Sequence, residues 1–135
     1  MNLGERIIGP VKTVTLERMR AFSGWPARNI HTDMEVAKKC GLAAPIASGA
    51  MFEGYLTDMM LELFGEDWLQ YGRMEVTFLK PVYAGSSVQL MAEVRSKINE
   101  ENEENFNLEI WGESQQGERF FTGSCTGRVL FASAR

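Results

Sequence analysis

The chain has 135 residues, of which 44% are hydrophobic and 24% charged, and its formal net charge is −4. This is the composition of an ordinary globular protein, so a disordered, collagen-like or disulfide-stapled chain is excluded. The 18 acidic residues outnumber the 14 basic ones, and no apolar run reaches the ~18 residues of a transmembrane helix, so we expect neither a nucleic-acid partner nor a membrane.

The first predicted elements are short. Loose alternation over Ile7–Val14 indicates a strand, and Thr15 has the position and chemistry of an N-cap for a helix that ends at Gly24. A loop follows, because proline and asparagine interrupt any period. Asp33 is then expected to cap a short helix that runs to Cys40.

The longest helix is predicted from about Ser48 to Phe64, just before Gly65. Its apolar side chains recur at helical spacing and form one broad face, made by Phe52, Tyr55, Leu56, Met59, Met60 and Leu63. Asp58 and Glu62 fall on the opposite side. Glu53 does not join them, and lies at the edge of the apolar face.

After this helix the apolar period changes to two, which indicates half-buried strands of an antiparallel sheet. The alternating segments are Met74–Phe78, Val88–Val94, Phe106–Ile110 and Phe121–Phe131. The first pair is expected to be joined at Ala84–Ser86, the second at Asn99–Glu104 and the third at Gln115–Gly117. We therefore expect a sheet wrapped around a helix, and a homodimer, because so short a chain cannot easily cover both the helix and its sheet edges.

The length fits one hydrophobic core, so we expect a single domain over residues 1–135. Cys40 and Cys125 are far apart, and with one histidine they make no metal-ligand cluster. A Gly-rich nucleotide loop is also missing, and we expect no metal and no cofactor. Two thiols make no disulfide framework, and Met1–Pro10 does not have the apolar run of a signal peptide, which favours the cytoplasm.

Two segments are candidates for chemistry. His31, the one histidine, lies in the predicted loop, where an exposed or capping role is commoner than a catalytic one. Pro45–Met51 places small residues at the start of the long helix, where the first amides have no intrahelical partner. Such amides can hold the oxygen of a thioester or its enolate, but small residues are also what tight packing requires.

Together the two segments resemble the MaoC-like dehydratases, which are (R)-specific enoyl-thioester hydratases of the hotdog fold. The resemblance rests on Asn29–Asp33, on Pro45–Met51 and on Phe78–Ser86, which is similar to the family's strand–Pro-Val–Gly hairpin. It covers roughly residues 15–94. It implies an α+β hotdog fold, in which a curved antiparallel sheet wraps around a central helix, and a dimer with sites near the subunit interface.

The resemblance also implies a reaction. Family members add water reversibly across a trans-2-enoyl thioester of coenzyme A or an acyl carrier protein, which gives an (R)-3-hydroxyacyl thioester. An aspartate and a histidine activate the water, and amides at the helix start hold the thioester oxygen. His31 matches the histidine and Gly49 matches the helix-start glycine.

The family's aspartate has no match in this chain. Its position falls on Trp25 or Pro26, depending on one inserted residue, and Ser48 stands where many members have histidine. Asp33 is one conceivable replacement, although its position suits a helix cap better. Asn29 is another, but an amide orients a water without accepting its proton.

Glu53 is the third conceivable replacement, because it follows Gly49 by about one helical turn. If it is partly buried among apolar side chains, its carboxyl has a raised pKa suited to proton transfer. A structural ion pair or hydrogen bond at the interface is the alternative. We expect His31 and Glu53 to be catalytic and to face one cavity, and the substrate-binding candidates to be Asn29, Ser48, Gly49 and Tyr55.

Three functions remain open. The first is an enoyl-thioester hydratase or dehydratase, the second is a thioesterase in which Glu53 activates water, and the third is a non-catalytic acyl-thioester binder. Other hotdog enzymes, the acyl-CoA thioesterases, carry a catalytic carboxylate on the central helix. The sequence does not rank the possible phosphate contacts, which are Lys12, Arg28, Lys80 and Arg119.

Overall fold

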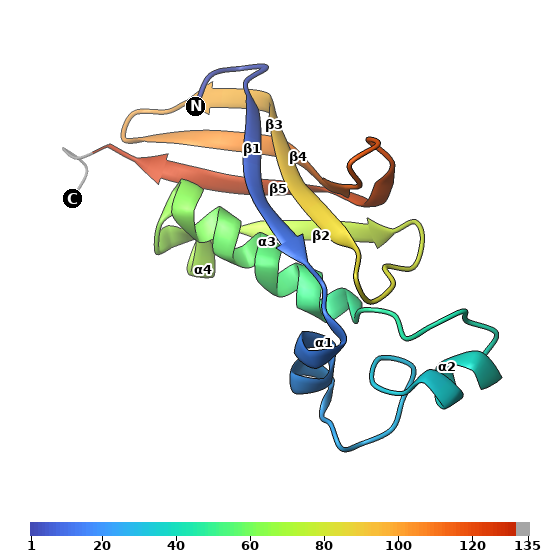
Figure 1. Ribbon diagram of the computed structural model, residues 1–135. Coiled ribbons are helices and arrows are strands. Elements are labelled where there is room, and N and C mark those ends of the chain that lie inside the picture. Colours follow the sequence, from blue (N-terminus) through green and yellow to red (C-terminus); the bar gives the residue numbers. More distant parts are fainter. Residues whose placement is uncertain (132–135) are drawn as a thin grey trace.

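Five antiparallel strands in the order β1-β3-β4-β5-β2 form a curved sheet around the long helix α3 in the computed structural model, which describes residues 1–131 (Figure 1). The strands are β1 (Arg6–Thr13), β2 (Arg73–Phe78), β3 (Ser87–Asn99), β4 (Glu103–Glu113) and β5 (Arg119–Leu130). The helices are α1 (Leu16–Ser23), α2 (Met34–Lys39), α3 (Gly49–Phe64) and α4 (Asp67–Tyr71). This arrangement confirms the expected α+β fold.

The core lies between α3 and the concave side of the sheet. The helix buries Met51, Phe52, Leu56, Met59, Met60 and Phe64. The largest part of the sheet's contribution comes from alternate residues of β3 and β4, namely Val88, Leu90, Ala92, Val94, Phe106, Leu108 and Ile110. The alternation predicted for these two strands is therefore confirmed. Tyr55 and Leu63 are only half-buried, because they lie at the margin of the buried stripe.

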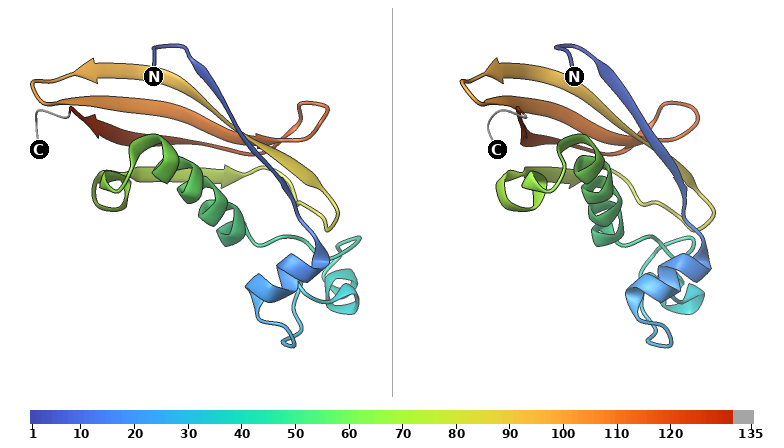
Figure 2. Two further views of the ribbon diagram at one scale, coloured as in Figure 1. Left: turned by 60° about the vertical axis from the view of Figure 1, so that its left-hand side comes forward. Right: turned by 90° about the vertical axis from the view of Figure 1, so that its left-hand side faces the viewer.

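Both short helices begin at the predicted caps. The Thr15 side chain accepts a hydrogen bond from the Arg18 amide, and the Asp33 side chain accepts one from the Val36 amide. Gly24 ends α1 in the left-handed conformation, with φ 88°, which costs glycine no steric strain. The segment that contains α1, α2 and their loop projects away from the sheet beyond the start of α3 (Figure 2).

The connection at Ala84–Ser86 is not the predicted hairpin. β2 pairs with β5, whereas β3 pairs with β1 and β4, so the chain crosses from one edge of the sheet toward the other. The connections between β3 and β4 and between β4 and β5 are hairpins, as predicted. Over residues 1–131, no helix combines the length and the apolar character needed to cross a bilayer.

Helix α4 was not predicted, because five residues are too few to show a helical period. Its Trp68 is buried and stacks on Phe64, with ring centroids 5.7 Å apart. This contact packs α4 against the C-terminal end of α3.

Candidate active site

His31 lies in a loop between α1 and α2 that is held by its own polar groups. The His31 amide donates to Asn29 Oδ1 at 2.9 Å, and Asn29 Nδ2 donates to the Ser23 carbonyl at 3.2 Å. The fully buried Thr32 hydroxyl donates to the Ala27 carbonyl and accepts from the Asn29 amide. The buried Thr32 hydroxyl therefore has both a donor and an acceptor, and these bonds hold the backbone at His31.

The ring of His31 is oriented by a backbone carbonyl. Its Nδ1 atom lies 2.7 Å from the oxygen of Ile46. Because a carbonyl oxygen only accepts, Nδ1 carries the proton, and in the neutral ring Nε2 is the basic nitrogen. Among the described residues no hydrogen bond to Nε2 is found, so this nitrogen is available to a ligand or to water.

The segment before α3 is attached to the connection between β2 and β3. Ile46 forms an isolated antiparallel bridge with Tyr83, and the Ala47 amide donates to the Val82 carbonyl at 2.8 Å. These bonds bring the His31 loop, the start of α3 and the connection together, although they are distant in the sequence.

A pocket of about 440 Å³ lies where these three segments meet. His31 and Gly49 both line it, as the sequence predicts for residues of one site. The other lining residues are Ile46, Ala47, Phe52, Phe78, Leu79, Lys80, Pro81 and Val82. Apart from His31 and Lys80, every lining side chain is apolar, so the pocket suits an acyl chain attached to a polar reacting group.

The start of α3, where Gly49 lines this pocket, has amides without a partner inside the helix. The N-cap residue Ser48 makes no side-chain hydrogen bond to them, and its carbonyl accepts from the Met51 amide at 3.1 Å. Among the described residues, no acceptor is found for the amides of Gly49 and Ala50. These two donors lie at the positive end of the helix dipole, which favours an oxygen that carries negative charge.

Gly49 also makes a close contact that a larger residue would disturb. A Cβ atom at this position would lie 2.8 Å from the ring of Phe78. Glycine therefore allows the first turn of α3 to approach β2, and the pocket is formed at that approach.

Glu53 does not meet the expectation of partial burial. Its side chain is exposed, and it is not among the residues that line the His31 pocket. Phe52 points into the core, and the next helical residue is turned by ~100° from it. Within one chain, the structure does not bring Glu53 and His31 into one cavity.

The remaining predicted site residues have other surroundings. Asn29 and Ser48 are not among the pocket-lining residues, and the Asn29 amide is used within its loop. Tyr55 lines a separate groove between β1 and α3, where its ring lies 4.8 Å from Lys12 Nζ. Gly49 is therefore the one predicted substrate-binding residue that lines the pocket.

Asp33 has the structural role that its position suggested. Its Oδ2 accepts from the Val36 amide at 3.0 Å and from the Arg28 guanidinium at 3.1 Å. The amide, and then the guanidinium, hold the pKa of Asp33 below its usual value. The ionised carboxylate caps α2 and does not line the pocket.

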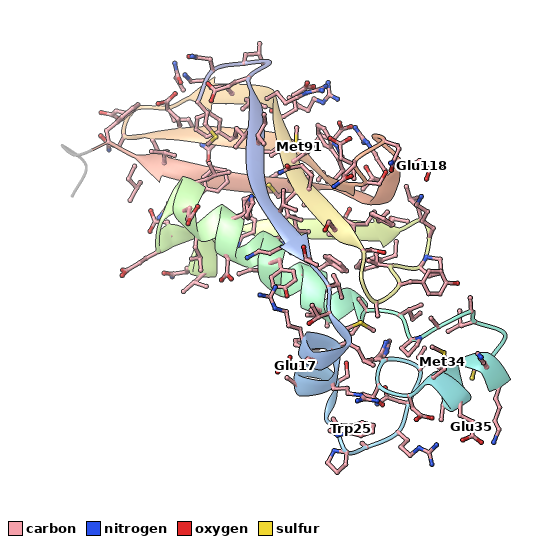
Figure 3. All side chains as sticks on the ribbon, in the orientation of Figure 1. Glu17, Trp25, Met34, Glu35, Met91 and Glu118 are labelled. Atoms are coloured by element: carbon pink, nitrogen blue, oxygen red, sulfur yellow. The ribbon has the colours of Figure 1, made fainter. Side chains whose placement is uncertain are left out.

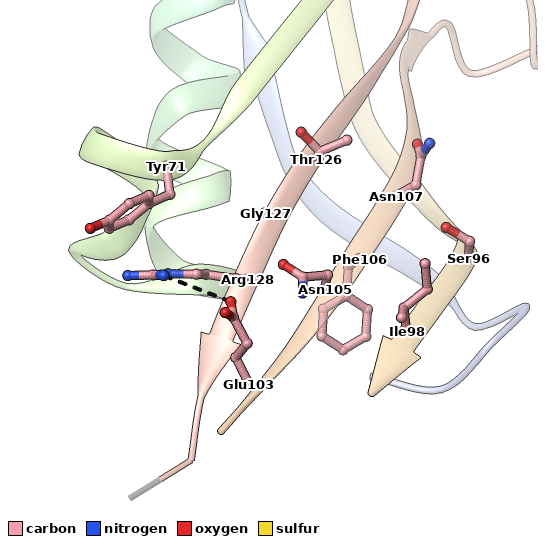
Figure 4. A pocket seen from close by; sticks show the side chains of 10 residues that line it. All are labelled: Tyr71, Ser96, Ile98, Glu103, Asn105, Phe106, Asn107, Thr126, Gly127 and Arg128. Carbon is pink, nitrogen blue, oxygen red and sulfur yellow. Dashed lines mark ion pairs between the residues drawn. The ribbon is translucent and has the colours of Figure 1, made fainter. Parts of the chain in front are cut away.

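A second hollow, of about 420 Å³, lies near α4 and the ends of β4 and β5 (Figure 4). The two charged residues that line this hollow form an ion pair, with Arg128 Nη1 3.7 Å from Glu103. The Arg128 guanidinium also lies 3.5 Å from the Tyr71 ring centroid. No histidine lines it. Over residues 1–131, no group of three His, Cys, Asp or Glu side chains converges in a way that could hold a metal ion.

The comparisons with known proteins agree with this fold. The family model described as MaoC like domain matches residues 10–110. No curated protein sequence matches the chain. A monoamine oxidase regulatory protein from Archaeoglobus is 27% identical, with a TM-score of 0.75 over 96% of this chain and 91% of that one.

Two enzymes share the fold at lower identity. The (R)-hydratase of A. caviae involved in PHA biosynthesis is 18% identical, with a TM-score of 0.75 over 97% of this chain and 98% of that one. The HadBC (3R-hydroxyacyl-ACP dehydratase) complex of Mycobacterium tuberculosis gives 16% identity and a TM-score of 0.71, over 93% of this chain and 96% of that one.

Proposed function

This chain belongs to the MaoC-like domain family and has its hotdog fold, and on that premise we propose that it hydrates enoyl thioesters reversibly. The product is an (R)-3-hydroxyacyl thioester, carried by coenzyme A or an acyl carrier protein. The observation that supports this most strongly is the pocket lined by both His31 and Gly49: among the described residues, His31 Nε2 has no hydrogen-bond partner and the Gly49 amide has no acceptor.

In the proposed reaction, the thioester oxygen accepts hydrogen bonds from the amides of Gly49 and Ala50. His31 Nε2 takes a proton from water as the water oxygen bonds to C3 and the π electrons move onto the thioester oxygen. The imidazolium then returns a proton to C2, and the carbonyl re-forms. A positioned base contributes ~10²–10⁴-fold, and one oxyanion donor contributes ~10²–10³-fold.

Glu53 belongs to this proposal in a different way. Since it is exposed and outside the pocket within one chain, it takes part in proton transfer only where a second subunit brings it to a His31 pocket. We assign the proton transfers to His31. Glu53 adds a carboxylate to the site only if dimerisation brings it to the His31 pocket of the partner subunit.

We further propose a homodimer. β2 is an edge strand of the sheet. Its last residue, Phe78, is 42% exposed and the following Leu79 is 55% exposed, and both line the pocket. Large apolar side chains next to an open strand edge are typical of an interface. The solved relatives include the HadBC and ChsH1-ChsH2 complexes of Mycobacterium tuberculosis. These complexes support the proposal that this chain also associates with a second chain.

One experiment tests the proposed function. The protein is incubated with enoyl, 3-hydroxyacyl and saturated acyl thioesters, and both the enoyl absorbance and free thiol are followed. We expect enoyl absorbance to fall with enoyl substrates and to appear with (R)-3-hydroxyacyl substrates. Release of thiol instead would identify a thioesterase, and binding with neither change would identify a non-catalytic binder.

A further inference from the structure

Of the described residues that line the His31 pocket, Lys80 alone carries a fixed charge. It belongs to the connection between β2 and β3, and the residues on both sides of it, Leu79 and Pro81, also line the pocket. Its ammonium lies 4.8 Å from the ring centroid of Phe120, and its side chain is 34% exposed. About two thirds of the Lys80 side chain is thus covered, and its ammonium lies against an aromatic ring.

Glu118 is the ion-pair partner of Lys80. Lys80 Nζ donates to Glu118 Oε2 at 2.5 Å, and this hydrogen bond lowers the pKa of Glu118. Glu118 lies at the turn between β4 and β5 (Figure 3), and its side chain is 73% exposed. An exposed ion pair adds little net stability, because water competes for both charges. An anion on a ligand can therefore replace Glu118 at small cost.

The other cations that the sequence left unranked are engaged elsewhere. Arg28 pairs with Asp33 and Glu35. Lys12 lies over Tyr55, in the groove on the β1 side of α3, and Arg119 pairs with Glu109. Since none of the three lines the His31 pocket, the geometry ranks Lys80 first.

We propose that Lys80 binds an anionic oxygen group of the thioester that occupies the His31 pocket, and that this group displaces Glu118. The inference rests on the proposed function, because a thioester substrate is what would bring the anion here. Two parts of such a substrate have this chemistry: the phosphate of a phosphopantetheine arm and the free carboxylate of a dicarboxylic acyl chain. Either group accepts charge-assisted hydrogen bonds from an ammonium.

The test compares Lys80→Met with Lys97→Met. Lys97 is a matched control, because it also pairs with a glutamate, Glu104 at 3.0 Å, and also lies over a phenylalanine ring, that of Phe106, but it does not line the pocket. Binding is measured by calorimetry with four saturated probes, so that no turnover is needed. The probes are the butyryl and glutaryl thioesters of coenzyme A and of N-acetylcysteamine, a carrier without phosphate.

We expect Lys80→Met to weaken binding of the anionic probes at least ~10-fold, the scale of a hydrogen bond to a charged group. Butyryl-N-acetylcysteamine, which has no charge, should bind unchanged, and Lys97→Met should change none of the four. If the phosphate is the ligand, Lys80→Met weakens the binding of both coenzyme A thioesters. If the carboxylate is the ligand, it weakens the binding of both glutaryl thioesters.

Glu118→Gln supplies an independent variant, since it removes the competing carboxylate and should tighten binding of the same anionic probes. Equal weakening of all four probes by Lys80→Met, or no weakening of any, would overturn the inference while leaving the proposed function intact. If the unmodified protein binds none of the four probes, the proposed function fails first, and the inference falls with it.

Discussion

The Nδ1 atom of His31 lies 2.7 Å from the carbonyl oxygen of Ile46, three residues before the start of α3. This bond joins the loop that carries His31, the proposed base, to the segment that leads into α3, where the amides of Gly49 and Ala50 have no acceptor among the described residues. It also assigns the tautomer, because Nδ1 must donate to the carbonyl and Nε2 is left as the acceptor. The two parts of the proposed chemistry are thus oriented by one contact.

His31→Ala should lower the rate of enoyl hydration by ~10²-fold or more, the usual contribution of a positioned base. Glu53→Gln should lower it less, because Glu53 is outside the pocket of its own chain. Steady-state kinetics on both variants and their double variant check this. A Glu53→Gln loss as large as that of His31→Ala, with a less-than-additive double variant, would show that a second subunit brings Glu53 to the reaction.

Local sequence chemistry predicted much of this fold. The caps at Thr15 and Asp33 and the inward alternation of β3 and β4 follow from short-range rules. The strand order does not, because the pairing of β2 with β5 joins segments separated by the whole of β3 and β4. A local pattern contains no information about such a partner, so the predicted pairing of β2 with β3 is wrong, whereas the two later hairpins are confirmed.

The candidate site was predicted in part. His31 and Gly49 were found through the family resemblance, and both line one pocket. The orientation of the His31 ring was not predicted, because it depends on the backbone carbonyl of Ile46. Every residue has such a carbonyl, so nothing in the sequence indicates this contact. Glu53 was placed at the edge of the apolar face, where a small rotation of the helix decides between burial and exposure.

Gly49→Ala should lower activity at least ~10-fold, as expected when access to an oxyanion donor is impaired. The new Cβ atom meets the far end of the Phe78 ring, which is partly exposed and can move, so the fold should survive. The matched control is Gly54→Ala, where a Cβ atom meets nothing within 4 Å. It should raise stability by ~0.5–1 kcal/mol, since alanine favours the helix interior, with activity unchanged.

Equal activity in the Gly49→Ala and Gly54→Ala proteins would contradict a role for the Gly49 amide. Kinetics and thermal unfolding of the two variants separate a loss of function from a loss of stability.

Thr32→Val should destabilise the His31 loop. The valine keeps the shape but removes the hydroxyl of a fully buried side chain, so the Asn29 amide loses its acceptor and the Ala27 carbonyl loses its donor. We expect a cost of ~1–3 kcal/mol, measured by chemical denaturation, together with lower activity. Thr57→Val is the control, since the Thr57 hydroxyl bonds only to the exposed Glu53 carbonyl of its own helix, and it should change stability by less than ~0.5 kcal/mol.

In solution the protein should have twice the mass of its 15.2 kDa chain. The reason is the edge strand β2, which ends in the exposed Phe78 beside the pocket. Light scattering at micromolar concentration measures this mass directly. A stable species at the mass of one chain would count against the dimer and against any contribution of Glu53 across an interface.

Stability should depend on the ionisation of Asp33. The Val36 amide, and then the Arg28 guanidinium, hold its pKa below the ordinary value of 3.8. The folded state therefore binds fewer protons than the unfolded state in this range, so the stabilisation is present above the ordinary pKa and is lost as the pH falls through the lowered one.

Asp33→Asn keeps a good N-cap but removes the charge. Its thermal midpoint should lie below that of the unmodified protein at neutral pH, and the two should converge in acid. Asp33→Ala, which removes the cap as well, should stay below both at every pH; a constant gap between the unmodified protein and Asp33→Asn would contradict the role of the charge.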